Sequence, residues 1–102
     1  MFARVTQLDV RPERLHEGHR EIEEHVYPAL RMQVGYSGGL LLANPEGGKM
    51  LAVTLWEDEQ DMRAIEEASH WFRVFGAGAF EGTVTDVENY EVYQARLTHP
   101  EP

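Results

Sequence analysis

The stretch 51–68, LAVTLWEDEQDMRAIEEA, contains the change of pattern that decides the fold. Residues 49–56 are mostly apolar or β-branched and predict a buried strand that ends at Trp56. The acidic residues that follow predict the start of a helix, because Asp58 is a good N-cap and first-turn carboxylates interact favourably with the helix dipole. Both faces of the strand are apolar, so one layer of helices cannot cover the sheet that contains it.

The chain on either side of this stretch predicts three further strands and one further helix. Residues 2–9 and 83–97 form the first and last strands, and residues 39–44 form a hairpin with the strand that ends at Trp56. A helix from Pro12 to about Met32 carries an apolar stripe of helical period. We expect Pro28 to bend or divide this helix, because proline cannot donate the backbone hydrogen bond.

The predicted order is therefore strand, helix, strand, strand, helix, strand (βαββαβ). With right-handed crossovers, this order gives an α+β, ferredoxin-like fold, in which a four-stranded antiparallel sheet of order 4-1-3-2 carries its helices on one face. We expect a single domain over residues 2–97 and a C-terminal tail over residues 98–102. The remaining apolar face should be covered by a second copy, which makes the protein a homodimer through the sheet face.

Composition excludes several classes of function. The chain has 102 residues, no cysteine, and 18 acidic against 9 basic residues, which gives a net charge of −9. This charge disfavours nucleic acid as a partner. No apolar run is long enough to span a bilayer, and the first residues lack a targeting pattern, so we expect no membrane partner. The absence of cysteine suits a reducing compartment, and we expect a cytoplasmic protein.

Three stretches resemble the antibiotic biosynthesis monooxygenase family of dimeric α+β barrels: YPALRMQVGYSGG (27–39), LAVTLWEDEQDM (51–62) and VENYEV (87–92). The resemblance covers residues 2–97 and is closest to the small uncharacterised bacterial members. It implies a dimeric α+β barrel. It identifies no single reaction, because the family includes quinone-forming oxygenases, haem-degrading enzymes and members of no known activity.

The haem-degrading branch matches this chain poorly. The resemblance would require an asparagine on the first strand, a tryptophan inside the second helix and a haem-ligating histidine near the end of that helix. The first strand has Thr6 and Gln7 instead, the helical position falls at or near Ile65, and the ligand position falls around Phe75 and Gly76. Because a haem site needs its axial ligand, we expect neither haem nor another cofactor.

The cofactor-independent oxygenases match at one position of two. They carry a tryptophan at the end of the third strand, which Trp56 matches, and an asparagine four residues earlier, where this chain has Ala52. Such an enzyme needs a dry pocket for a phenol or quinol, a proton acceptor and access for oxygen. The leading hypothesis is a cofactor-independent monooxygenase acting on a small aromatic. The alternative, which Ala52 favours, is a non-catalytic dimer that binds a small ligand or has a structural role.

His19 is the candidate catalytic residue. At 100° per residue, it lies within about 40° of the centre of the apolar stripe, next to the small Gly18, so its imidazole points toward the sheet. There it could accept a phenolic proton or form a structural hydrogen bond to a backbone carbonyl. The candidate substrate-binding residues, in a pocket between helices and sheet, are Ile22, Trp56, Met62, Ile65, Phe72 and Tyr90, of which Trp56 could equally be core and Tyr90 could face the dimer interface.

Two further patterns carry less weight. His16, His19 and Glu23 have helical spacings that could gather metal ligands, but His16 and Glu23 are rotated toward solvent, so we expect no metal site. The glycine-rich stretch GAGAFEG (76–82) leads into a strand rather than out of one, so it does not have the context of a phosphate-binding loop. We expect it to be a flexible connection or a lid.

Overall fold

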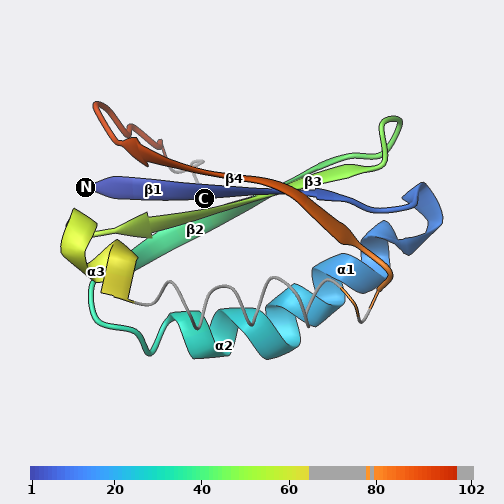
Figure 1. Cartoon of the computed structure of the whole chain (residues 1–102), viewed down its shortest axis with the longest axis horizontal. Helices are drawn as coiled ribbons and strands as arrows, with labels where there is room; N and C mark the ends of the chain where they lie inside the picture. Colours follow the sequence, from blue (N-terminus) through green and yellow to red (C-terminus); the bar gives the residue numbers. More distant parts are fainter. Residues whose placement is uncertain (65–77, 79, 99–102) are drawn as a thin grey trace.

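A four-stranded antiparallel sheet is the centre of the computed structural model, which describes residues 1–64, 78 and 80–98. The strands are β1 (Phe2–Asp9), β2 (Tyr36–Asn44), β3 (Lys49–Trp56) and β4 (Thr83–Glu91). Their order across the sheet is β2-β3-β1-β4, and every neighbouring pair is antiparallel. This is the predicted 4-1-3-2 order, so the α+β ferredoxin-like fold is confirmed (Figure 1).

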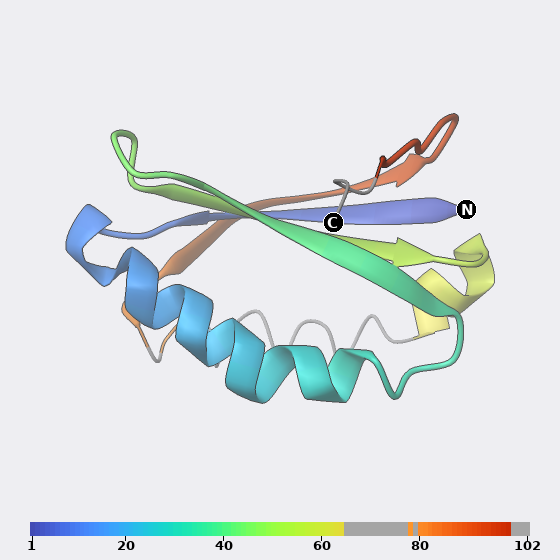
Figure 2. The same cartoon turned by 180° about the vertical axis from the view of Figure 1, so that it is seen from behind.

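The helical segment between β1 and β2 is divided where proline was expected to divide it. It consists of η1 (Pro12–Arg14), α1 (Leu15–Glu21), η2 (Ile22–Val26) and α2 (Tyr27–Leu30). The η2 turn is π-helical: the N–H of Tyr27 donates to the carbonyl of Ile22, five residues back. Pro28 has no N–H to give to the preceding turn, and the wider turn immediately before it accommodates that loss. Figure 2 shows this segment running along one face of the sheet.

Helix α3 (Glu59–Ala64) begins three residues after the end of β3. The Asp58 carboxylate accepts a hydrogen bond from the backbone N–H of Asp61 at 2.9 Å, so the predicted N-cap is confirmed. No helix within residues 1–64, 78 and 80–98 is both long and apolar enough to cross a bilayer.

The two faces of the sheet have different surroundings. Arg4, Thr6 and Leu8 point toward the helices, because alternate residues of a strand share a face and these three line the space beneath the helical segment. The opposite face carries apolar side chains at Val5, Leu40, Leu42, Leu51, Val53 and Leu55. Leu40 and Leu42 are 51% and 48% exposed, and no element of the described ranges covers this face (Figures 1 and 2).

A hydrophobic core cluster lies just before the start of β4, where Phe80 is packed against Leu8, Val10 and Met50. Phe80 is only 1% exposed. It belongs to the stretch 76–82 that was expected to be a flexible connection, so this expectation is wrong at Phe80 itself. Residues 76, 77 and 79 lie outside the described residues.

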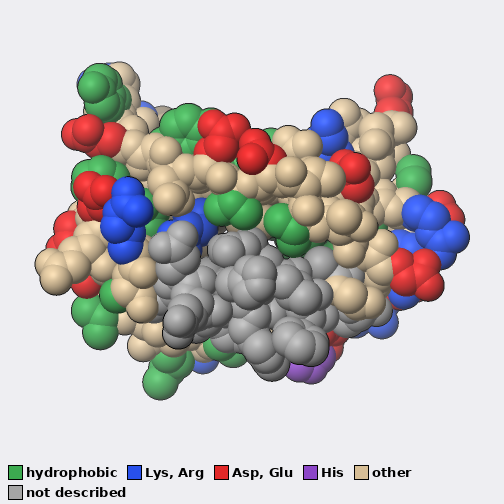
Figure 3. All heavy atoms as spheres, in the orientation of Figure 1, with side chains coloured by type: hydrophobic (Ala, Val, Ile, Leu, Met, Phe, Trp, Pro, Cys, Tyr) green, Lys and Arg blue, Asp and Glu red, His purple; other side chains and the backbone are tan. Residues whose placement is uncertain are grey.

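Glu81, the residue after Phe80, is fixed by two arginines from the start of the helical segment. Its carboxylate accepts a hydrogen bond from Arg11 and lies 3.4 Å from the Arg14 guanidinium. Basic and acidic side chains lie together at the right-hand end of Figure 3. Glu81 has φ of 59°, a left-handed conformation that is unfavourable for a residue with a Cβ. The ion pairs and the buried neighbour therefore hold the chain in a costly conformation where it enters β4.

The last strand is shorter than predicted, because β4 ends at Glu91 and not at residue 97. β4 pairs with β1, which begins at Phe2, the partner of Glu91, so the β1–β4 ladder ends at this pair. The N–H of Val92 donates to the carbonyl of Met1 at 2.9 Å, and beyond it Tyr93 is 91% exposed.

Candidate functional site

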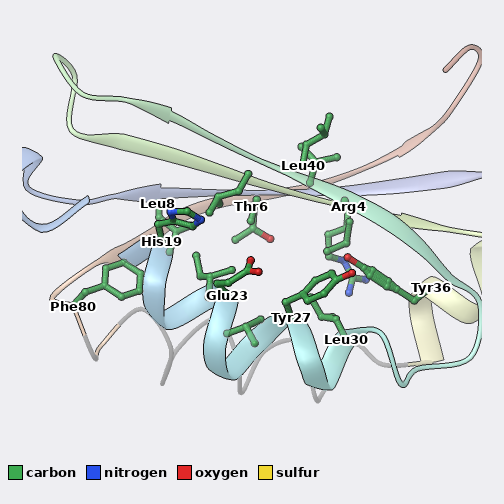
Figure 4. A pocket seen from close by; sticks show the side chains of 17 residues that line it. Arg4, Thr6, Leu8, His19, Glu23, Tyr27, Leu30, Tyr36, Leu40 and Phe80 are labelled. Atoms are coloured by element: carbon green, nitrogen blue, oxygen red, sulfur yellow. The ribbon is translucent and has the colours of Figure 1, made fainter. Parts of the chain in front are cut away.

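A cavity of about 250 Å³ lies between the helical segment and the sheet (Figure 4). The described residues that line it are Arg4, Thr6, Leu8, Tyr36, Gly39, Leu40, Leu41, Ala52, Val53 and Thr54 from the sheet, His19, Ile22, Glu23, Val26, Tyr27 and Leu30 from the helical segment, and Phe80. Leu40 and Val53 border it from the sheet, but they alternate with Gly39 and Thr54, so their side chains belong to the opposite face. In Figure 4, Arg4, Tyr27 and Tyr36 gather toward one end and His19, Leu8 and Phe80 toward the other. The cavity therefore has polar groups near both ends of a largely apolar wall.

Two of the predicted site residues, His19 and Ile22, line this cavity. His19 is an exposed residue and Ile22 is half-buried. Glu23 is also exposed and lines the cavity, so an imidazole and a carboxylate lie together at its mouth. His16 does not line the cavity; it borders a shallow surface depression that His19 and Glu23 share.

The other predicted site residues lie elsewhere or outside the described residues. Trp56 and Met62 are fully buried, at 0% and 1% exposure, and are absent from the cavity lining. Tyr90 pairs with Ala3 and lies on the sheet face that points away from the helices, where its hydroxyl donates to the Glu88 carboxylate. Ile65 and Phe72, like His70 and Trp71, lie outside the described residues.

Trp56 is linked to the cavity through its neighbours. Its indole stacks on the Tyr36 ring, with centroids 5.4 Å apart and 29° between the planes. Its Nε1–H donates to the Thr54 hydroxyl at 3.0 Å. Tyr36 and Thr54 both line the cavity. Trp56 thus packs behind the wall and sets the position of two residues that form it.

Tyr36 is held on several sides. Tyr27 meets its ring edge-on, with centroids 6.3 Å apart. A Cβ placed on Gly39 would lie 3.0 Å from the Tyr36 hydroxyl and 2.6 Å from the carbonyl oxygen of Val53, so the hydroxyl occupies space that only glycine leaves open. Burial raises the pKa of Tyr36 above its ordinary value, and the nearby Tyr27 raises it further. Tyr36 therefore stays a neutral hydrogen-bond donor at physiological pH.

The strand register places four residues on one transverse row of the sheet, which we call the donor row: Gly39, Thr54, Arg4 and Asn89. The Tyr36 hydroxyl lies over the Gly39 end of this row. Arg4 is only 3% exposed, and its Nε donates to the Asn89 side-chain oxygen at 3.1 Å. The row therefore brings two hydroxyls and a guanidinium to one part of the cavity.

The next row toward His19 consists of Leu41, Ala52, Thr6 and Val87. Ala52, where the resemblance would place an asparagine, lines the cavity with a methyl group. Thr6 is the polar residue of this row, so the row is far less polar than the donor row beside it.

No group of three histidine, cysteine, aspartate or glutamate side chains in the described part of the chain is arranged to hold a metal ion. His16, His19 and Glu23, which have suitable helical spacing, form no such group.

Sequence reasoning did not identify Tyr36, Thr54, Arg4 or Phe80 as cavity residues. A signal existed for Arg4, because it shares one face of the strand with Phe2 and Leu8, two large apolar residues. A signal existed for Thr54 in its shared face with Trp56. The positions of Tyr36 and Phe80 depend on loops that fold back against the sheet, and local periodicity does not encode them.

No family model matches the chain. Two uncharacterised proteins of Mycobacterium tuberculosis are each 29% identical to it, over 100 and 99 residues, which cover 98% and 97% of this chain. The chain spans only 42% and 44% of the length of these curated relatives.

Solved structures resemble the chain closely in fold. A candidate antibiotic biosynthesis monooxygenase of Deinococcus radiodurans has a TM-score of 0.71 at 16% identity, covering 98% of this chain and 100% of that one. A Streptomyces coelicolor monooxygenase in complex with nanaomycin D has a TM-score of 0.70 at 18% identity, covering 98% and 92%.

Two other solved structures bear on cofactor use and assembly. A cofactor-independent oxygenase of Streptomyces nogalater has a TM-score of 0.63 at 16% identity, covering 98% of this chain and 97% of that one. A protein described as dimeric and ferredoxin-like, from an uncultured marine organism, has a TM-score of 0.67 at 11% identity, covering 95% and 98%. The resemblance drawn from the sequence is thus confirmed at the level of the fold: this chain has the ferredoxin-like fold of the antibiotic biosynthesis monooxygenases.

Proposed function

We propose that the protein is a cofactor-independent monooxygenase that acts on a small aromatic of the phenol or quinol type. The observation that carries this proposal is the apolar cavity, with a donor row toward one end and His19 toward the other. The shared fold with a cofactor-independent oxygenase supports it.

The size of the cavity limits the substrate. Its volume of about 250 Å³ is just below the range of roughly 300–1,000 Å³ that is usual for pockets of drug-sized ligands. A molecule of one or two fused rings would fill it. The ring would contact apolar side chains such as Ile22, Val26 and Leu41.

The chemistry needs no bound redox group, because the substrate supplies the electrons. Removal of a phenolic proton gives an electron-rich anion that can react directly with O₂. For a ring methylene beside the phenol, the balanced reaction is R₂CH₂ + O₂ → R₂C=O + H₂O: carbon loses four electrons, and one oxygen atom enters the product while the other leaves as water. The protein has to bind the ring, take up the proton and exclude bulk water.

His19 is the residue we assign to proton uptake, since a neutral imidazole can accept a phenolic proton near neutral pH. It lines the cavity and is exposed, so a proton that it accepts can pass to solvent. Glu23 lines the cavity beside it and would stabilise the imidazolium that forms.

Oxygen uptake tests the proposal. The purified protein would be given a panel of one- and two-ring hydroquinones and naphthols, and oxygen consumption would be compared with the rate without protein. We expect consumption above background for at least one compound, and a loss of at least about a hundredfold in His19→Ala, the lower end of the usual range for a general base. His16→Ala is the matched control, because His16 lies on the same helix but does not line the cavity. Equal rates for His19→Ala and the unmodified protein would contradict the role of His19.

The second candidate function is a non-catalytic dimer that binds a small ligand. Ala52 favours it, because a methyl group stands in the cavity wall where the resemblance places an asparagine. No oxygen consumption across the panel, together with binding of the same compounds, would establish this alternative. Titration with haemin gives a separate test of cofactor use, for which we expect no shift of the Soret band.

We also propose that the protein forms a homodimer through the open face of its sheet. The apolar side chains at Val5, Leu42, Leu51 and Val53 lie on that face. Such a contiguous apolar face is unusual on a monomer, and a second copy would bury it. The structural neighbour described as dimeric and ferredoxin-like supports this assembly.

A further inference from the structure

Two hydroxyls, those of Tyr36 and Thr54, meet on the cavity side of the sheet at its Gly39–Thr54 pair. Gly39 and Thr54 are directly opposite each other in the register of β2 and β3. Opposite residues of an antiparallel pair have Cβ positions about 4.5–5.5 Å apart. Because the Tyr36 hydroxyl lies 3.0 Å from the Cβ position of Gly39, it is a near neighbour of the Thr54 side chain.

Trp56 determines whether the Thr54 hydroxyl donates or accepts their shared hydrogen bond. The indole Nε1–H can only donate, so the Thr54 oxygen must be the acceptor of their 3.0 Å hydrogen bond. Threonine keeps one proton of its own, and this proton is then directed away from the indole. Within the described residues, neither the Thr54 nor the Tyr36 hydroxyl donates a hydrogen bond, and both residues line the cavity.

Trp56 also fixes the Tyr36 ring. The stacked indole, the edge of Tyr27 and the backbone at Gly39 bound this ring, so its hydroxyl has little freedom to turn away. The same buried indole, 0% exposed, thus orients both hydroxyl donors. Two fixed donors that converge on one place form a site for a single acceptor oxygen.

We infer that Tyr36 and Thr54, oriented by Trp56, bind an oxygen acceptor on the edge of the ligand ring, and that the cavity therefore selects aromatic ketones, quinones and phenolates over hydrocarbons of the same shape. Trp56 acts here as a positioning residue. The inference rests on the proposed function in taking an aromatic ring with an oxygen substituent as the ligand, and it adds the residues that hold this oxygen.

A matched pair of redox-inert ligands tests this directly. 1-Tetralone and tetralin have the same two-ring frame and differ by one carbonyl oxygen. We expect calorimetric titration to show that 1-tetralone binds about tenfold more tightly than tetralin, as expected for two hydrogen bonds of ordinary net strength. Tyr36→Phe and Thr54→Val should each reduce this preference to about threefold, and the double variant should abolish it, while the affinity for tetralin changes little.

Control variants separate binding from folding. Thr54→Ser retains the hydroxyl and should retain the preference. Tyr93→Phe and Thr85→Val remove a hydroxyl from exposed positions and should leave both affinities unchanged. The role of Trp56 is measured by a double-mutant cycle between Trp56 and Thr54. Trp56→Phe should lower the preference for 1-tetralone when Thr54 is present, and should change this preference much less in Thr54→Val. If Trp56 had a merely structural role, Trp56→Phe would change the preference equally with Thr54 and with Val at residue 54.

Three results would overturn the inference: equal affinities for the two ligands, binding of neither ligand, or a preference that persists in the double variant. Its failure is distinguishable from failure of the proposed function. Oxygen consumption by a protein without this preference would refute the donor pair alone. A clear preference without oxygen consumption would support the donor pair and refute the oxygenase.

Discussion

Gly18 lies so close to Phe80 that a Cβ at residue 18 would be 3.1 Å from two carbons of the phenyl ring and 3.2 Å from the Met50 sulfur. This contact joins the helical segment to the residue that precedes β4. It also closes one end of the cavity, since Phe80 lines it. A residue without a side chain is therefore what lets the helix approach the core.

Gly18→Ala should destabilise the protein. Alanine would gain about 1 kcal/mol in helix propensity, but overpacking a full core costs about 1–3 kcal/mol. Phe80 and Met50 are each 1% exposed, so neither can move into solvent to make room. We expect the free energy of unfolding in urea to fall by about 1 kcal/mol. Gly78→Ala is the control, because no heavy atom of the other described residues lies within 4 Å of a Cβ there. If Gly18→Ala were as stable as the unmodified protein, this would show that the core side chains can rearrange to accommodate the added methyl group.

Glu81 gives a test of backbone strain. Glu81→Ala and Glu81→Gly both lose the ion pairs to Arg11 and Arg14, but only glycine tolerates φ of 59° without cost. We expect the glycine variant to be more stable than the alanine variant by about 1 kcal/mol in urea unfolding. At Glu17, in α1, the order should reverse, because glycine is the poorer helix former. If Glu81→Ala were as stable as Glu81→Gly or more stable, this would argue against the left-handed conformation at residue 81.

Tyr36 should make stability fall at high pH. Burial raises its pKa in the folded state above the unfolded value of about 10, so the folded protein keeps a proton that the unfolded chain releases. This contribution to stability is fully present below about pH 10 and is lost as the pH rises toward the folded-state pKa. Urea unfolding between about pH 8 and pH 11 should show a shallower decline for Tyr36→Phe than for the unmodified protein.

Leu42 tests the proposed dimer. It is 48% exposed on the open face of the sheet and does not line the cavity. Leu42→Lys would bury a charge in the interface, at a cost of several kcal/mol unless it is paired. We expect sedimentation to give twice the chain mass of 11.7 kDa for the unmodified protein and the monomer mass for Leu42→Lys. Lysine also reduces the net charge of −9, so overall repulsion would not explain dissociation. Val34→Lys, 80% exposed outside the sheet, should remain dimeric; a monomeric unmodified protein would refute the proposal.

Local sequence patterns were enough for the fold. The loose alternation in 2–9, the apolar run 49–56, the helical stripe after Pro12 and the Asp58 cap each depend on residues a few positions apart, and the structure has an element at each place. The end of β4 was predicted less well. A strand continues only while a neighbour supplies hydrogen bonds, and the position where β1 begins is not visible in the sequence of β4.

Local patterns in the chain specify the order of the elements, the sheet topology and the face of the helix that carries His19, because periodicity and chain connectivity act locally. Which side chains form the cavity depends instead on how separate elements pack together. The donor row joins Thr54 to Arg4 and Gly39 across separate strands, and the Tyr36 hydroxyl reaches this row because residue 39 has no side chain. Trp56 shows the difference between local pattern and tertiary packing. The sequence predicted it as a substrate-binding or a core residue; the structure buries it outside the cavity lining, where it contacts the Tyr36 ring and the Thr54 hydroxyl.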